Sequence, residues 1–186
     1  LLRAQGYTVH LGGNIGTPLF DRIADIRPDD FAVLELSSFQ LHSMHCAPDV
    51  AIITNISPNH LDVHPDFEDY VSAKCSIYRG QRPDGVLVLN ARDAHTPRFA
   101  AEAPGSVRYF SSIGPVENGV YCSDGVIYRA HGGKAEKLID VSDIRIPGAH
   151  NVENYMAAFA ATDGLVGQAA CVQVARSFAG VPHRME

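Results

Sequence analysis

The sequence has no paired cysteine motif and no excess of basic residues, and both absences narrow the classes of protein to which it can belong. The four cysteines, Cys46, Cys75, Cys122 and Cys171, form no Cys-x-x-Cys pair, which argues against a zinc ribbon and a disulfide scaffold. The 186 residues include 15 Lys and Arg against 21 Asp and Glu, a net charge of −6, which argues against a nucleic-acid partner. We expect reduced thiols and a cytoplasmic protein.

Long apolar runs are also missing. No stretch reaches the roughly 18 residues that a membrane span needs, and there is no internal repeat or low-complexity linker. Hydrophobic residues make up 46% and charged residues 19% of the chain, which is a globular composition. We therefore expect one folded domain with a sizeable core and no membrane partner.

Short apolar segments alternate with segments of helical spacing over the first two thirds of the chain. The expected strands are residues 7–11, 31–36, 50–56, 86–90 and 107–110, and the expected helices begin at Pro18 after a Thr17 cap and cover residues 66–80 and 93–101. The runs at 31–36 and 50–56 are typical of strands buried on both faces. This alternation predicts an α/β fold with a mostly parallel sheet flanked by helices.

The pattern changes between residues 107 and 141. Residues 119–122 and 126–129 flank a Ser-Asp-Gly turn, and Gly132-Gly133 forms a second turn, so a small antiparallel hairpin or meander is inserted in the main sheet or appended to it. Helical spacing returns at residues 151–161 and 168–179.

Lys74 is the most informative single residue. It follows Phe67, Tyr70 and Val71 at spacings of seven, four and three, so a helix places it on the apolar stripe that faces inward. Either the side chain runs along the helix surface and keeps its ammonium in water, or burial lowers its pKa and leaves a neutral amine that can react or be modified.

Glu35 lies inside the expected strand 31–36, where an unpaired carboxylate is costly. It is either a strand-end carboxylate in solvent or a metal ligand at the carboxyl edge of a parallel sheet, where ligands of open α/β sheets bind. Ser37, Ser38 and Gln40 follow directly and supply neutral hydrogen-bonding groups.

His60 and His64 follow the next expected strand and have a His-x-x-x-His spacing, which on a helix suggests a zinc pair. Pro58 and Pro65 bracket too short a segment for a stable helix, so a zinc pair is not favoured. Oxygen and imidazole groups without a thiolate cluster suit Mg²⁺ better than a structural zinc.

Several of these residues belong to six short blocks in a fixed order. The blocks are Gly12-Gly13-Asn14-Ile15-Gly16, Leu34-Glu35-Leu36-Ser37-Ser38-Phe39-Gln40-Leu41, Asn55-Ile56-Ser57-Pro58-Asn59-His60-Leu61-Asp62, Tyr70-Val71-Ser72-Ala73-Lys74, Gly148-Ala149-His150-Asn151 to Asn154, and Pro182-His183-Arg184. Their order is the one found in Mur ligases, and the chain resembles that family along nearly its whole length. The second block is typical of the members that add D-glutamate.

The resemblance implies ATP-dependent amide synthesis in bacterial peptidoglycan assembly, on a P-loop-type central domain. ATP would phosphorylate the carboxylate of UDP-N-acetylmuramoyl-L-alanine, and the amine of D-glutamate would attack the acyl phosphate. Mg²⁺ would neutralise the phosphates and the developing oxyanion.

In that family the lysine matching Lys74 is carbamylated and helps to hold Mg²⁺, and Glu35 and His60 match the other metal ligands. The resemblance thus implies that Lys74 and His60 are catalytic. Asn59 stands before His60 where many relatives carry an acid, which would weaken the field at the metal.

The resemblance also assigns substrate contacts. Asn14, Ser37 and Gln40 match residues near the UDP-sugar, and Asn154 and Arg184 match residues that contact the nucleotide.

A phosphate loop of the form Gly-x-x-x-x-Gly-Lys-Ser/Thr is missing from the sequence. In the family this loop precedes the helix whose last turn the opening residues 1–6 resemble. We therefore expect residues 1–186 to be a partial central domain, without the phosphate loop, the N-terminal UDP-binding domain or the C-terminal domain, and inactive alone.

Three other functions remain open. A paralogous Mur or folylpolyglutamate-type ligase would use the same chemistry on another acceptor, and only the Ser-Ser-Phe-Gln segment argues against it. A non-catalytic nucleotide-binding domain would have no use for an inward lysine. A metal hydrolase built on the histidines would contain tightly bound zinc.

Overall fold

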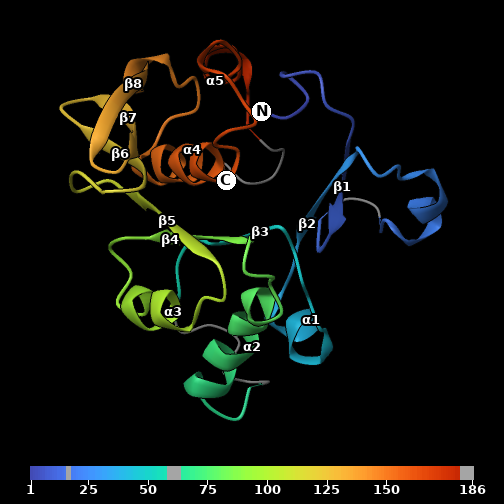
Figure 1. Cartoon of the computed structure of the whole chain (residues 1–186). Helices are drawn as coiled ribbons and strands as arrows, with labels where there is room; N and C mark the ends of the chain where they lie inside the picture. The colour runs from blue at the N-terminus through green and yellow to red at the C-terminus, as the bar shows by residue number, and fades with distance from the viewer. Residues whose placement is uncertain (16–17, 58–63, 181–186) are drawn as a thin grey trace.

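The computed structural model describes residues 1–15, 18–57 and 64–180, which form two sheets with helices packed on the larger one (Figure 1). The larger sheet has six strands in the order β3 (Val50–Ile53), β4 (Val86–Asn90), β5 (Ser106–Ser111), β6 (Gly119–Ser123), β7 (Val126–His131) and β8 (Lys134–Asp140). Strands β3 to β6 pair in parallel, and β6 to β8 pair antiparallel. The predicted α/β fold is confirmed, and the meander belongs to the main sheet.

Helices cover both faces of this sheet. α2 (Phe67–Arg79) and α3 (Thr96–Glu102) lie on one face, and α4 (Ala149–Ala161) and α5 (Gln168–Ser177) lie on the other (Figure 1). Strand β4 shows why the sheet needs both layers: Leu87 and Leu89 pack in the core with α2 and α3, whereas Val88 packs in the core with α4. Its continuous apolar run is therefore buried on both faces, as parallel strands require.

The N-terminal strands form a separate two-stranded parallel sheet of β1 (Val9–Gly13) and β2 (Phe31–Glu35). The prediction that strands 31–36 and 50–56 are buried on both faces is wrong. Val33 and Leu34 of β2 are exposed, and so is Ile52 of β3, because β2 belongs to a small sheet and β3 is an edge strand of the large one. An apolar run in the sequence does not indicate whether a layer of helices covers the strand.

Two helical segments near the N-terminus also differ from expectation. The helix predicted after Pro18 is the short 3-10 helix η1 (Phe20–Asp25), which contains no buried residue, and its expected cap Thr17 lies outside the described residues. Without an apolar face to bury, local capping signals do not sustain an α-helix. The six-residue helix α1 (Ser38–Ser43) was not predicted.

The remaining 3-10 helix, η2 (Val141–Asp143), links the meander to α4. All four cysteines are free, as expected for reduced thiols. Within the described ranges no helix has the length and apolar character that crossing a membrane requires.

Candidate functional site

Glu35 and Asn14 meet at the carboxyl ends of β1 and β2. The Asn14 backbone N–H donates to the Glu35 carbonyl at 2.7 Å, and Gly13 lies opposite Glu35 in the register. Gly13 has φ +96°, and a Cβ atom there would lie 2.2 Å from the Glu35 carbonyl oxygen. Only glycine permits this approach, so Gly13 allows the backbone of Asn14 to lie beside Glu35.

Lys74 projects from α2 toward the same region. Asp66 caps this helix by accepting from the Asp69 N–H at 2.8 Å. Lys74 is half-buried, and its Nζ lies 5.9 Å from the centre of the Tyr70 ring. Burial lowers the pKa of Lys74, and the negative charge of Glu35 opposes this by raising it. A larger neutral fraction is what an amine needs to react with carbon dioxide.

Ser37 and Gln40 form the first turn of α1 directly after Glu35. The Gln40 backbone N–H donates to Ser37 Oγ at 3.3 Å, and Gln40 Oε1 accepts from the Ser37 N–H at 2.9 Å. This reciprocal capping box satisfies two N–H groups of the helix terminus. Both predicted substrate residues therefore fix the turn that follows Glu35.

His64 is held by partners that the sequence did not reveal. Its ring is buried, with Nδ1 2.7 Å from Asp69 Oδ2 and Nε2 3.0 Å from Ser38 Oγ. The hydrogen bond with His64 holds the pKa of Asp69 below its usual range, and His42 acts in the same direction. The only signal in the sequence was an acid at the third position of the helix that begins just after His64.

The family assignment follows from comparison with known proteins. Residues 6–162 match the model of the Mur ligase middle domain. The chain belongs to this family.

Individual relatives give the same result. The chain is 48% identical, over its whole length, to the UDP-N-acetylmuramoylalanine–D-glutamate ligase of Acetivibrio thermocellus, and it spans 40% of that protein. A solved UDP-N-acetylmuramoyl-L-alanyl-D-glutamate–2,6-diaminopimelate ligase matches with a TM-score of 0.73 and 20% identity, over all of this chain and 43% of that one. The MurF ligase of Thermotoga maritima, solved in complex with ADP, matches with a TM-score of 0.62 and 19% identity, over 98% of this chain and 45% of that one.

The structure describes only some of the predicted site residues of this Mur ligase domain. His60, Asn59 and Arg184 lie outside the described residues. Asn154 is exposed on α4, which covers the opposite face of the large sheet from α2. The structure thus brings Asn14, Glu35, Ser37, Gln40 and Lys74 to one edge, and places Asn154 elsewhere on the sheet.

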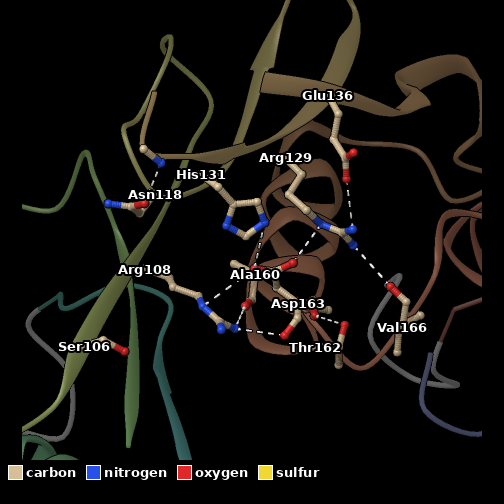
Figure 2. Close-up of polar contacts among 12 residues, drawn as sticks. Ser106, Arg108, Asn118, Arg129, His131, Glu136, Ala160, Thr162, Asp163 and Val166 are labelled. Carbon is tan, nitrogen blue, oxygen red and sulfur yellow. Dashed lines mark hydrogen bonds and ion pairs between the residues drawn. The ribbon is translucent and has the colours of Figure 1, made fainter. Parts of the chain in front are cut away.

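A second polar cluster lies at the C-terminal end of α4 (Figure 2). The side chain of Asp163, 5% exposed, forms ion pairs with Arg129 at 2.9 Å and Arg108 at 3.8 Å, and His131 Nε2 lies 3.5 Å from its Oδ2. Both arginines also donate to backbone carbonyls at the end of α4 and in the turn after it. The ion pairs and the Arg108 hydrogen bond to the last turn of α4 join strands β5 and β7 to the end of that helix, so the cluster stabilises the fold.

Proposed function

We propose that the chain is the central domain of a Mur ligase that adds D-glutamate to UDP-N-acetylmuramoyl-L-alanine in peptidoglycan biosynthesis. The observation that carries this proposal is the half-buried Lys74, whose pKa is lowered by burial and which lies within the electrostatic reach of Glu35. The name of the relative at 48% identity and the Leu34–Leu41 block support D-glutamate as the acceptor.

The proposed reaction has two steps. The γ-phosphoryl group of ATP moves to a carboxylate oxygen of UDP-N-acetylmuramoyl-L-alanine, and ADP leaves. The amine of D-glutamate then attacks the carbonyl carbon of the acyl phosphate, the amide bond forms, and phosphate and the amine proton leave. We assign the UDP-sugar to Asn14, Ser37 and Gln40, and the nucleotide to Asn154 and Arg184.

The residues beside Lys74 fit a magnesium ion. Glu35 offers carboxylate oxygens, and carbamylation would replace the Lys74 ammonium with an anionic oxygen donor; hard oxygen donors are what Mg²⁺ prefers. His60 completes the proposed ligand set. A bound Mg²⁺ would supply positive charge for the phosphates and the developing oxyanion. The lowered pKa of Lys74 favours the neutral amine from which a carbamate forms.

We further propose that this domain needs additional sequence to work. The chain spans 40% of the Acetivibrio thermocellus relative and contains no phosphate loop of the Walker type. Turnover of ATP by the purified 186-residue chain would contradict this proposal.

A chimaera tests the function. The 186 residues replace the matching segment of the Acetivibrio thermocellus ligase, and a control chimaera carries the corresponding segment of a diaminopimelate-adding ligase. We expect the first to release phosphate from ATP when given Mg²⁺, UDP-N-acetylmuramoyl-L-alanine and D-glutamate, and the control not to. Release only with another amino acid would indicate a paralogous ligase, and no release with any acceptor would indicate a non-catalytic domain.

The lysine is tested in the same chimaera. Lys74→Ala should lower D-glutamate-dependent release by about 10²-fold or more, the scale of losing one preorganised electrostatic group. Lys134→Ala, at an exposed lysine of β8, is the matched control and should retain activity. Removing dissolved carbon dioxide should lower the activity of the unmodified chimaera, and bicarbonate should restore it.

A further inference from the structure

Two imidazoles and a carboxylate converge where α1 meets the start of α2. Potential ligand atoms of His42, His64 and Asp69 all lie within 4.8 Å of one another. Asp69 lies between the two rings, with Oδ1 3.3 Å from His42 Nε2 and Oδ2 2.7 Å from His64 Nδ1. These three residues, called the α1–α2 triad below, include neither Glu35 nor Lys74.

The spacing of the triad suits a small tetrahedral ion. Zinc bonds of about 2.0–2.2 Å to nitrogen and oxygen place neighbouring ligand atoms roughly 3.3 Å apart in a tetrahedron. The His42–Asp69 distance of 3.3 Å matches this value, and the His64–Asp69 distance of 2.7 Å is that of a hydrogen bond, which would have to lengthen by about 0.6 Å to admit an ion.

The buried histidine is also oriented as a metal ligand would be. The rear nitrogen of a ligating histidine usually bonds a neighbouring oxygen, which fixes the ring. His64 Nε2 has such a partner in the buried Ser38 hydroxyl, at 3.0 Å. The His64 ring also stacks on Phe39, with ring centroids 5.6 Å apart, and makes an edge contact with Tyr70, with centroids 5.4 Å apart.

We propose that the α1–α2 triad binds one divalent transition-metal ion of the Zn²⁺ class, with a fourth position open to water. Two imidazoles and one carboxylate favour such an ion over Mg²⁺, which prefers oxygen ligands. The ion binds Nδ1 of the neutral His64 ring, whose single ring hydrogen then lies on Nε2 and is donated to Ser38 Oγ, a hydroxyl that serves equally as donor or acceptor. A ring that starts with its hydrogen on Nδ1 gives that proton to solvent and takes one up at Nε2, so the ring loses no net proton.

The ion has a route to this site. The side chain of His42 is 58% exposed, and it borders a hollow of about 430 Å³ between α1 and α2. Tyr70 contacts both the His64 ring and Lys74 Nζ, so one aromatic side chain connects the triad with Lys74.

Zinc titration of the 186-residue protein tests the proposal. A chromophoric chelator competes for Zn²⁺ in buffer with millimolar Mg²⁺, which occupies oxygen-only sites. We expect one zinc equivalent to bind, and Co²⁺ to give the intense visible bands of four-coordination. His42→Ala should weaken binding by at least 10-fold, whereas His45→Ala, at an exposed histidine three residues away, should leave it unchanged.

Lys74→Met separates this site from the proposed magnesium site. It should retain zinc binding, because Lys74 is not a member of the triad. Circular dichroism of each variant checks that it is folded, and the exposure of His42 makes unfolding by its substitution unexpected. Absence of zinc binding in the unsubstituted protein, full binding in His42→Ala, or equal losses in His42→Ala and His45→Ala would each overturn the proposal.

Discussion

The Asp163 cluster at the end of α4 and the edge around Lys74 differ in how many oppositely charged partners surround the buried charge. Asp163 is surrounded by positively charged side chains, and its arginine partners also reach backbone carbonyls (Figure 2). Lys74 contacts an aromatic ring, and the charge of Glu35 does not offset its burial, so its pKa falls. A buried charge with many matched partners stabilises the fold, whereas one with few becomes chemically reactive.

Removing the centre of the Asp163 cluster should have the largest effect. Asp163→Ala leaves Arg129 and Arg108 without their shared carboxylate, and breaking a buried ion pair from one side costs roughly 3–5 kcal/mol. Urea unfolding measures this loss. Asp84→Ala, which removes the exposed partner of Arg82, is the control and should change stability little. Equal effects of the two substitutions would show that the cluster is not a buried network.

Gly13→Ala should destabilise the edge around Lys74 through a steric clash rather than through the loss of an ion pair. The added Cβ would collide with the Glu35 carbonyl, and such overpacking costs about 1–3 kcal/mol beyond the strain of a positive φ. Gly6→Ala has a similar φ of +101° but no atom within 4 Å of its Cβ, so it isolates the strain, about 1–2 kcal/mol. Unfolding free energies give the difference, and equal losses would contradict the close approach.

The stability of the protein should depend on pH through Lys74. Its pKa is lower in the folded than in the unfolded chain, so between the folded value and 10.5 the unfolded chain binds more protons. The free energy of unfolding should therefore rise with pH in this window, relative to Lys74→Met, which lacks the titrating group. The measurement needs a metal chelator and buffers free of carbon dioxide. Parallel profiles of the two proteins would show that burial does not shift the lysine.

The smallest expected effects come from substituting two asparagines of α4, which should separate stability from nucleotide binding. Asn151 donates to the Pro147 carbonyl at 2.6 Å, so Asn151→Ala should cost about 1 kcal/mol of stability and leave the KM for ATP of the chimaera unchanged. Asn154 is exposed, so Asn154→Ala should change stability by less than about 0.5 kcal/mol and raise that KM several-fold. The same KM for both variants would remove Asn154 from the proposed nucleotide site.

Features that depend on periodicity were predictable from the sequence. The predicted inward stripe of α2 includes the half-buried Lys74, and the expected strand at residues 86–90 is β4. The exposure of β2 was not predictable, because its apolar run resembles that of β4 and only the tertiary arrangement decides which strand is covered.

The polar partners of the site were harder to predict. The His64 contacts join α1, the segment before α2 and α2 itself, and the Ser38–His64 bond spans 26 residues. Sequence spacing detects pairs on one helix but not pairs that meet through packing. His64 was therefore weighed with His60, whereas its described partners are Ser38 and Asp69.

Because β1 and β2 form a separate sheet, the free energy of local unfolding should differ between this sheet and the large one. Amides of β4, inside the core, should exchange with solvent deuterium only on global unfolding, whereas amides of β2 should exchange through smaller local openings. Glu35, at the end of β2, should therefore open with this small sheet. A ligand that binds at this edge would have to order β1 and β2. Slower amide hydrogen exchange in these two strands would therefore report its binding.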